Sequence, residues 1–529
     1  MTTLKQEADM LLGIDFGTTR TVVATVDRGN YPVASFQLAN GDSQDWYPSV
    51  IAARGSEFQF GFDAAARQAE IAAGEATGWK IRRGFKRKLA QYGPDTPITI
   101  NEQPISALDL LTAFLAQLRS DLIERSNLRL PRRYQFETMI SVPANANSNQ
   151  RFITLEAFRR AGFEVRGMIN EPSAAGIEYA HQVLSSDSTP RREHLVVYDL
   201  GGGTFDAAVI SIAHRMHDVL SSDGIARLGG EDFDQILLDL ALEQAGITEI
   251  TRSARQKLLE ECREKKEGLH PNTRKLAIDL ERGGSGTSGA GEVIVTTADY
   301  YERCRPLVER TIEATERAIH KALGAADTGS LSAVYLVGGS SDLPVVARTL
   351  RERYGRLVRR SPYPHAATAI GLAIAADAGA GYRLRESFTR YFGVWRESDN
   401  GKALTFDVIF DKDTRLPEKN GVPLMSQRRY HSAHNLGHYR YLECSNISRD
   451  NGLCHPRGDI TPWDEVRFPF ALELREDKNL EERQVRRLPG DGNLIEETYT
   501  CNQHGIIEVQ ITDLTDFYQQ SFRLRGKKS

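Results

Sequence analysis

Asp199 stands at the end of an apolar run and just before a turn of three consecutive glycines, Gly201, Gly202 and Gly203. Glycine has no Cβ, so such a turn can adopt positive φ and bring backbone N–H groups close to an anion. A carboxylate repels a bare phosphate, so the natural partner of Asp199 is the hydrated Mg²⁺ that accompanies a nucleotide. The pattern indicates a cradle for a metal-bound polyphosphate. A tight hairpin in a buried sheet is the alternative interpretation.

The same pattern occurs a second time near the N-terminus. An apolar run there leads to Asp15, and the turn after it contains Gly17, Thr18 and Thr19. Two related hairpins predict two related lobes that face each other across a cleft, with Asp15 and Asp199 aimed at one metal. A clamp of this kind closes on its nucleotide, so it can work as a switch.

The elements that must position these turns alternate between strand and helix. The strand Phe136–Val142 ends at Pro143, and a helix is expected around Arg151–Ala161. Pro172 fits the first turn of another helix, which begins near Glu171. This alternation predicts an α/β core with helices on both faces of the sheet.

The basic stretch Trp79–Leu89 has two interpretations. It carries Lys80, Lys86 and four other cations, and a charge run of this kind is commonly a solvated face. If the segment instead borders the cleft, one of its lysines can reach the γ-phosphate.

The pattern changes after about Phe388. The segments Ala403–Phe410, Ile495–Thr500 and Ile506–Thr512 alternate apolar and polar residues and are typical of antiparallel strands. No long helical pattern occurs after residue 390. The C-terminal part is therefore predicted to be a β-sandwich with one solvated face.

Histidines and cysteines gather in this C-terminal part, and a metal site there stays open beside the simpler interpretation of a loop cluster. Their spacing matches no tight zinc pattern and includes no paired cysteines. The residues are His431, His434, His438, Cys444, Cys454 and His455.

Composition excludes several classes of protein. Lys and Arg number 67 against 71 Asp and Glu, so no basic excess points to nucleic acid as a partner. No window approaches the roughly 18 apolar residues that span a bilayer, so no membrane partner is expected. The first residues, MTTLKQEADM, lack the features of a signal peptide, which favours a cytoplasmic protein with its five cysteines reduced.

Six motifs, taken together and in this order, resemble the nucleotide-binding domain of the seventy-kilodalton heat-shock chaperones. They are IDFGTT, VPANANSNQR, INEPSAAGIEYA, DLGGGTFD, LGGEDFD and LVGGSSDLP. The resemblance covers residues 10 to 380 and implies the actin-like fold, in which two lobes clamp MgATP. It divides the chain into a tail at 1–9, the nucleotide-binding domain at 10–380, a linker at 381–390 and a β-sandwich peptide-binding-like domain at 391–529.

The resemblance also implies site residues. Asp15 and Asp199 would hold Mg²⁺ through waters, Asp206 would position the attacking water or the metal, and Thr204 would lie beside the γ-phosphate. Lys86, with Lys80 as a rival, would be the catalytic lysine. Glu171 would accept a proton or orient water, which suits phosphoryl transfer because that reaction needs little beyond in-line water and charge stabilisation. The remaining contacts to ATP would come from Gly17, Thr18, Thr19, Gly201, Gly202, Gly203, Gly229, Gly230, Glu231, Lys266, Gly338, Gly339, Ser340 and Ser341.

A relay between the nucleotide and the partner domain would run through Pro143 and Arg151. Around the base, however, the chain departs from the family. Glu267 stands where a basic residue is usual, Asp342 replaces an arginine that often stacks on the base, and Arg20 replaces a tyrosine or asparagine. Loss of a cation from an aromatic face costs roughly 0.5–2 kcal/mol. Base binding is therefore expected to be weak or to depend on other contacts.

The C-terminal part resembles the family's peptide-binding domain more loosely, mainly in IEETYTCNQHGIIEVQITD. The chain stops at Ser529, which leaves no room for a helical lid, so bound peptide is expected to exchange quickly. The segment Tyr382–Arg390 is polar where the family has an apolar linker. Coupling between ATP and the second domain is therefore in doubt.

The sequence favours an ATP-dependent chaperone-like protein that hydrolyses MgATP and binds unfolded or specific polypeptide segments. Recognition would use backbone pairing to an extended peptide, with a co-chaperone and a nucleotide-exchange factor as possible partners. An ATP-binding scaffold with one dedicated partner and a small-molecule kinase on the same fold stay open as alternatives. The client and the oligomeric state are left open.

Overall fold

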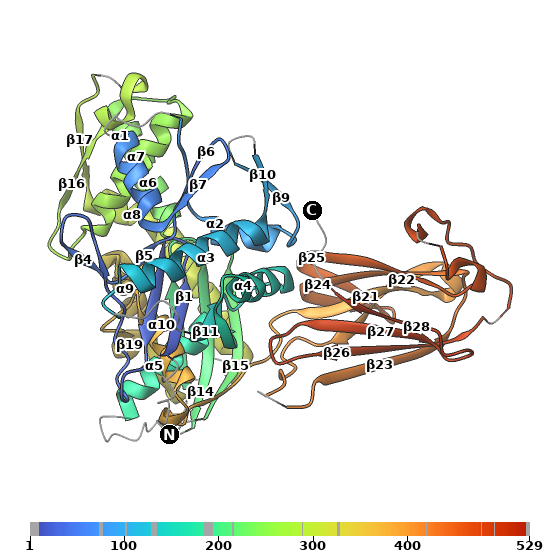
Figure 1. Cartoon of the computed structure of the whole chain (residues 1–529). Coiled ribbons are helices and arrows are strands. Elements are labelled where there is room, and N and C mark those ends of the chain that lie inside the picture. Colours follow the sequence, from blue (N-terminus) through green and yellow to red (C-terminus); the bar gives the residue numbers. More distant parts are fainter. Residues whose placement is uncertain are drawn as a thin grey trace, which may run out of the picture.

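The computed structural model places two lobes beside a set of C-terminal strands (Figure 1). It describes residues 10–72, 78–100, 103–128, 135–184, 194–213, 216–287, 289–324, 328–418, 421–477, 479–490 and 492–524. Among the helices in these ranges, none combines the length and the apolar character needed to cross a lipid bilayer.

The first lobe, lobe I (residues 10–170), is built on a sheet of strand order β12-β11-β1-β2-β5. Strand β1 pairs antiparallel with β2 and parallel with β11, as the predicted hairpin requires. Two helices, α3 (Ala107–Glu124) and α4 (Ser148–Arg160), pack on its core. The strands are β1 (Met10–Phe16), β2 (Arg20–Thr25), β5 (Tyr47–Pro48), β11 (Phe136–Val142) and β12 (Glu164–Asn170).

Capping residues set where these two helices begin. The Ser106 side chain accepts the N–H of Asp109 at 3.0 Å and so caps the start of α3. Helix α4 begins at Ser148, three residues before the predicted start at Arg151, because the Asn147 side chain accepts the N–H of Gln150 at 2.9 Å. Arg151 therefore lies within the first turn of α4 and is not its first residue.

The second lobe, lobe II (residues 194–360 together with the later strand at 383–385), has a sheet of order β19-β18-β13-β14-β15-β20. The predicted hairpin around the three glycines is β13 with β14, and β13 also pairs parallel with β18. The strands are β13 (His194–Leu200), β14 (Phe205–Ala213), β15 (Met216–Ile225), β18 (Leu331–Val337), β19 (Val358–Arg360) and β20 (Arg383–Arg385).

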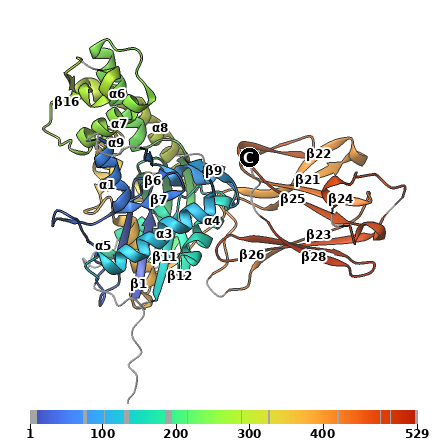
Figure 2. The same ribbon diagram turned by 45° about the horizontal axis from the view of Figure 1, so that its top comes forward.

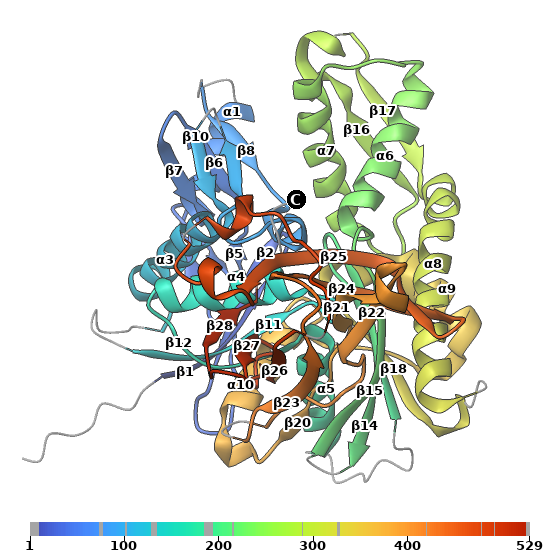
Figure 3. The same cartoon turned by 90° about the vertical axis from the view of Figure 1, so that its right-hand side faces the viewer.

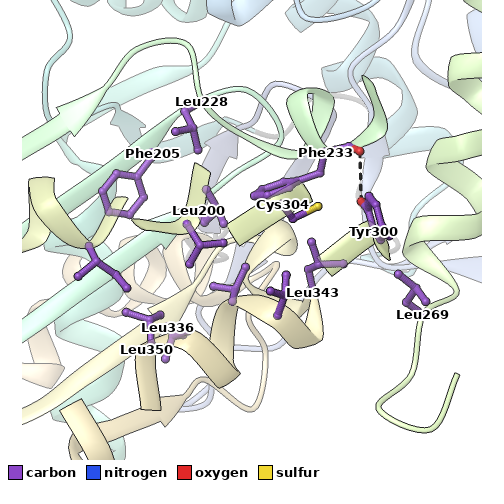
Figure 4. Packing of buried hydrophobic residues seen from close by; sticks show 14 of the residues in the cluster. Leu200, Phe205, Leu228, Phe233, Leu269, Tyr300, Cys304, Leu336, Leu343 and Leu350 are labelled. Atoms are coloured by element: carbon purple, nitrogen blue, oxygen red, sulfur yellow. Dashed lines mark hydrogen bonds between the residues drawn. The ribbon is translucent and has the colours of Figure 1, made fainter. Parts of the chain in front are cut away.

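A large apolar cluster joins this sheet to four helices. Phe233 and Tyr300 belong to this cluster, and the Tyr300 hydroxyl donates to the Phe233 carbonyl at 3.2 Å (Figure 4). This hydrogen bond pairs a buried phenol that would otherwise lose its water. The helices are α6 (Gly230–Ala245), α7 (Arg252–Glu267), α8 (Thr297–Leu323) and α9 (Pro344–Tyr354).

Two helices join the lobes to each other. Helix α5 (Glu171–Leu184) packs on the lobe II sheet, and α10 (Ala367–Ala376) packs on β1 and β2 of lobe I. The two helices also contact each other closely, since a Cβ at Gly371 would lie 1.8 Å from the Ala174 carbonyl oxygen. Only a glycine allows this approach of one helix to the other's backbone.

Each lobe carries an outer arm, and the two arms stand on opposite sides in Figure 3. The arm of lobe I consists of β6 (Ile51–Arg54), β7 (Glu57–Phe60), α1 (Gly61–Ala72), β8 (Lys80–Arg82) and the short helix α2 (Phe85–Lys88). That of lobe II consists of α6, α7, β16 (Lys275–Asp279) and β17 (Glu292–Thr296).

The C-terminal strands form two four-stranded sheets, of order β22-β21-β24-β25 and β23-β26-β27-β28. They share one apolar core, and they lie to one side of the lobes in both Figure 1 and Figure 2. The strands are β21 (Tyr391–Ser398), β22 (Ala403–Phe410), β23 (Leu424–His431), β24 (Leu436–Asp450), β25 (Leu453–Pro469), β26 (Leu494–Cys501), β27 (Ile507–Asp513) and β28 (Gln519–Arg523).

The segment between the lobes and these sheets is itself part of a sheet. Strand β20 pairs parallel with β15 and forms the edge of the lobe II sheet. The polar segment after Gly381 is therefore attached to lobe II by backbone hydrogen bonds, which do not depend on apolar side chains.

Candidate functional site

A cavity of about 1450 Å³ lies between the two lobes. It collects residues from both predicted hairpins, from the basic stretch, from α5 and from the arm of lobe II. The predicted site residues that line it are Asp15, Gly17, Thr18, Thr19, Lys86, Glu171, Asp199, Gly201, Gly202, Thr204, Gly230, Glu231, Lys266, Gly338, Gly339 and Ser340. Residues far apart in the sequence thus meet at one surface.

The other predicted site residues lie beside this cavity or away from it. Gly203 packs against Thr18, and Gly229 packs against the Gly202–Gly203 backbone. Ser341 is buried and donates to the Gly338 carbonyl at 2.7 Å. Asp206, Pro143 and Arg151 are not part of the cavity wall either.

The glycine turns of the two lobes approach each other so closely that side chains would not fit. A Cβ at Gly202 would lie 2.8 Å from the Thr19 methyl group, across the gap between the hairpins. A Cβ at Gly230 would meet the Ser340 hydroxyl at 2.5 Å and the Lys266 Nζ at 3.1 Å. A side chain at either position would therefore displace its neighbours, which accounts for glycine at both.

Lys86 and Glu171 form a buried ion pair at the cavity wall. The Lys86 Nζ lies 2.5 Å from Glu171 Oε1 and 3.9 Å from Asp15 Oδ1. Both Lys86 and Lys80, its rival in the sequence, line the cavity. Lys86 is buried against Glu171, whereas Lys80 is exposed on the edge strand β8. Glycine at position 84 adopts φ +66° just before α2 and turns the chain so that the lysine points inward.

Carboxylates crowd around this pair and change one another's pKa. Burial raises the pKa of Glu171 to about 7, with Lys86 opposing and Asp15 and Asp206 adding to the rise. Burial also raises the pKa of Asp206 to about 6. The pKa of Asp199 is raised well above its usual range by burial, and the charge of Glu171 raises it further. Burial alone would lower the pKa of Lys86, but the carboxylates raise it.

A hydrated divalent cation in the cavity would neutralise part of the negative charge of these carboxylates. The described residues contain no group of three or more His, Cys, Asp or Glu side chains placed to hold a metal directly. That statement covers the described part of the histidine and cysteine cluster of the sequence, where His438 instead faces Glu465 at 2.5 Å. The donors fit Mg²⁺ held through water, because hard carboxylate oxygens are its preferred partners.

The far end of the cavity is crossed by an ion pair between the lobes. Arg20, at the start of β2, reaches Glu267 at the end of α7, where the two side chains lie 2.6 Å apart. The guanidinium also lies 4.7 Å from the centre of the Trp46 ring. Asp342 pairs with Arg360. Arg20 and Glu267, two of the departures noted in the sequence, thus complement each other in charge.

Several residues at the site were not found by sequence reasoning. The Ser141 hydroxyl donates to Asp15 Oδ1 at 2.9 Å, and Arg87 reaches Glu231 of the opposite lobe at 2.9 Å. Arg83 likewise contacts Glu260 at 3.1 Å. Arg83 and Arg87 belong to the basic stretch Trp79–Leu89. Charge alone does not indicate whether such side chains face solvent or the cavity. Ser141 has no signal beyond its place near the end of a strand.

Arg151 lies at the boundary with the C-terminal sheets. Its Nη1 donates to Asn170 Oδ1 at 3.1 Å, and its Nε donates to the His504 carbonyl at 3.3 Å. Burial lowers the pKa of Arg151, and the charge of Glu386 opposes that shift. Arg151 thus touches both the last residue of β12 and the turn between β26 and β27.

Two lobes that close on a cavity with paired glycine hairpins, several carboxylates and a buried lysine define a nucleotide-binding class of protein. A family model described as Hsp70 protein matches residues 11–388 of this chain. The chain belongs to the Hsp70 family. Its members have an actin-like ATPase domain, bind ATP with Mg²⁺ and act on unfolded polypeptides together with co-chaperones.

Proposed function

We propose that this chain is an ATP-dependent chaperone-like protein. Residues 10–380 form its nucleotide-binding domain, 381–390 its linker and 391–529 a β-sandwich that binds extended polypeptide. The observation that carries the proposal is the buried Lys86–Glu171 pair in a cavity lined by both glycine hairpins. Such a pair costs desolvation energy, and its place at the cavity wall gives it a chemical use.

Each side chain has a defined part in this proposal. MgATP, when bound, supplies the γ-phosphoryl group and the positive charge that the carboxylates face. Asp15 and Asp199 orient the hydrated metal, and the glycine turns hold the phosphates by backbone N–H groups. Lys86 stabilises negative charge beside Glu171, which orients water and takes its proton. Thr204 stands at the cavity wall after the third glycine, and Asp206 supports the same water from behind.

The β-sandwich is proposed to bind an extended segment by pairing with an exposed strand edge. Strand β23 lies at the edge of its sheet, and its side chains alternate between half-buried and exposed. Met425 on this strand is 59% exposed. An extended peptide that pairs with such an edge gains backbone hydrogen bonds, and alternate side chains supply the selectivity.

A second candidate is an ATP-binding scaffold with one dedicated partner. The charged base end of the cavity favours it, because Arg20 and Glu267 satisfy each other without a nucleotide. A scaffold of this kind would hydrolyse ATP slowly and respond to its partner, not to unfolded chains in general.

The deciding experiment is steady-state ATP hydrolysis by the full chain, with and without a reduced, unfolded polypeptide. The chaperone proposal expects slow basal turnover that the polypeptide raises. Lys86→Ala should abolish hydrolysis and leave MgATP binding largely intact, whereas Lys88→Ala, exposed on the same short helix, should change neither. Normal hydrolysis by Lys86→Ala would contradict the role of Lys86 as the catalytic lysine. A turnover rate that no polypeptide changes would favour the scaffold.

A further inference from the structure

The connection between β25 and β26 contains a short segment, the strap (residues 484–488), that pairs with another connection of the sandwich. The strap runs antiparallel to residues 433–435, which follow β23, and His434 and Arg487 stand directly opposite each other. Two backbone hydrogen bonds flank this pair, from the Leu488 N–H to the Ala433 carbonyl at 2.9 Å and from the Asn435 N–H to the Arg486 carbonyl at 3.0 Å. The strap is thus a short added strand on the C-terminal sheets.

Asn435 holds the main chain of the strap and not its side chains. Its Oδ1 accepts the Arg486 N–H at 2.7 Å, and its Nδ2 donates to the Gln484 carbonyl at 3.3 Å. Contacts to backbone atoms are available to any extended segment, whatever its sequence. The connection after β23 is therefore able to hold extended main chain, and the strap is the segment that it holds.

One side-chain contact adds selectivity for arginine. Arg487 Nη2 lies 2.5 Å from Glu397 Oε2, near the end of β21, and His434 lies 3.5 Å from the same carboxylate. Gly401 has φ +85°, and a Cβ there would lie 2.8 Å from Arg487 Nη2. The glycine turn between β21 and β22 thus leaves room for a guanidinium beside Glu397. Residues 433–435 and Glu397 together form the strap site.

The strap lies on the surface and not in a core. All five of its residues are exposed, and Val485 and Leu488 remain 40% and 42% exposed. The Arg487–Glu397 pair is exposed as well, and an exposed ion pair contributes little to stability. Segments with few buried apolar contacts open at a low cost in free energy. The strap can therefore leave its site while the sheets stay folded.

We propose that the strap is an internal competitor for the polypeptide that the C-terminal sheets bind, and that an extended segment containing an arginine displaces it. This inference rests on the proposed polypeptide binding. The incoming arginine replaces Arg487 at Glu397, and the incoming main chain replaces that of the strap at Asn435. A tethered segment acts at an effective concentration of about millimolar, so only polypeptides that bind more tightly than the strap are retained.

A reversible cross-link between the strap and its site tests this role. His434 and Arg487 form a pair flanked by hydrogen bonds, and the Cα atoms of such a pair lie about 4.5 Å apart, within reach of a disulfide. The full chain with His434→Cys and Arg487→Cys is compared in its oxidised and reduced forms. The probe is a fluorescent peptide of residues 481–490, EERQVRRLPG, and its affinity is measured by anisotropy.

The oxidised form should lose binding of the probe, because the closed strap fills the site. The reduced form should bind the probe at least as tightly as the wild type, because its strap no longer reaches Glu397. The wild-type chain taken through the same oxidation should keep its affinity. A probe with alanine at the position of Arg487 should bind about two- to fivefold more weakly, the range expected for an exposed ion pair.

Two neighbouring arginines supply a matched pair of single variants. Arg487 contacts Glu397 through its side chain, whereas Arg486 joins the strand pairing through its backbone, which alanine keeps. Arg487→Ala should raise the affinity for the probe about two- to fivefold, because the strap competes less well. Arg486→Ala should leave the affinity near the wild-type value. This pair decides the matter if the double cysteine variant fails to fold or to form its disulfide.

The outcomes separate this proposal from the function on which it rests. Equal affinity in the oxidised and reduced forms, or equal effects of Arg487→Ala and Arg486→Ala, would overturn the competitor role while polypeptide binding stands. A chain that binds a reduced, unfolded polypeptide but not the probe would overturn it too. If the wild-type chain and the reduced variant bind neither, polypeptide binding and the competitor role are rejected together.

Discussion

At the scale of single residues, Glu171 combines two features that a general base needs. It lies against the cavity between the lobes, and burial raises its pKa to about 7. A carboxylate with so high a pKa accepts a proton readily near neutral pH, whereas an ordinary glutamate is too weak a base. The same property makes its activity depend on pH.

We expect single-turnover hydrolysis to fall as the pH drops below about 7. The raised pKa means that Glu171 is protonated below that value, and a protonated carboxyl cannot take a proton from water. Bound metal attracts the deprotonated form, so the midpoint in the presence of MgATP should lie at or below pH 7. The measurement is a rate profile from about pH 5.5 to about pH 8.5, a range that extends roughly 1.5 units to each side of pH 7.

Glu178 on the same helix supplies the control for this profile. Burial raises the pKa of Glu178 to about 7 as well. Its Oε2, however, accepts from the Tyr335 hydroxyl at 2.7 Å, and Glu178 does not line the cavity. Glu178→Gln should therefore leave the midpoint in place. A profile that is flat, or a midpoint that disappears in Glu178→Gln, would show that Glu171 is not the titrating group.

The pair Arg20–Glu267 joins the two walls of the cavity, so its loss should speed nucleotide release. The side chains are 27% and 42% exposed, and an exposed pair contributes roughly 0.2–1 kcal/mol. Arg20→Ala should therefore raise the release rate of a fluorescent ATP analogue about two- to fivefold. The charge swap Arg20→Glu with Glu267→Arg should bring the rate back towards the wild-type value.

Salt provides the control for this pair. The wild-type release rate should rise with ionic strength as the pair is screened, and the rate of Arg20→Ala should change less. Equal salt dependence in both proteins would contradict a role for the pair in holding the lobes together.

At the scale of elements, the contact between α5 and α10 decides how the lobes are joined. Gly371 of α10 lies against the backbone of Ala174, where a Cβ would be 1.8 Å from the carbonyl oxygen. Backbone atoms of a packed helix cannot move aside as the end of a flexible side chain can. The helices must separate if a side chain is introduced at this point.

Gly371→Ala should therefore lower the free energy of unfolding by about 3 kcal/mol. The better helix propensity of alanine, worth about 1 kcal/mol, only partly offsets the overlap. Thermal unfolding with and without MgATP is the measurement. Gly268→Ala, at a position with φ −82° and no neighbour closer than 3.6 Å, should be nearly neutral. An equal change in both variants would contradict the role of this contact.

Much of the element order can be predicted from the sequence, but contacts between distant segments cannot. The hairpins at Asp15 and Asp199, the cap at Ser106 and the C-terminal strands all carry local signals of spacing and turn chemistry. The polar linker put coupling between ATP and the second domain in doubt. No local pattern in the sequence indicates that Glu386 is buried and accepts the Asn170 N–H. The complementarity of Arg20 with Glu267 is equally invisible, since each charge alone is typical of a solvated surface.

At the scale of the whole molecule, the C-terminal sheets and lobe I share part of a core. Ile506, just after the turn that touches Arg151, is 9% exposed and belongs to the apolar cluster of lobe I. Lys321 of α8 adds a contact of 2.7 Å with Asp413 on the side of lobe II. Both lobes therefore hold the sandwich in this arrangement.

Ile506→Ala should separate the unfolding of the sandwich from that of the lobes. Removal of buried methylene groups costs about 2–5 kcal/mol, and here that cost falls on the boundary between two cores. Calorimetry should resolve two transitions in the variant, of which MgATP shifts only the one that belongs to the lobes. Leu404→Ala, at a site that is 44% exposed on β22, should leave the trace unchanged. A variant trace with a single transition would contradict this prediction.

The packing of α10 on β1 also sets an order of events during synthesis on the ribosome. A Cβ at Gly13 would lie 2.3 Å from the Ala369 carbonyl oxygen, so the first strand is in direct contact with one of the last helices of the ATPase region. Lobe I emerges early, yet β1 and β2 cannot pack against α10 until residues 367–376 have left the exit tunnel. The nascent chain therefore exposes an apolar sheet face for most of its translation, and apolar surface exposed in this way is prone to aggregation.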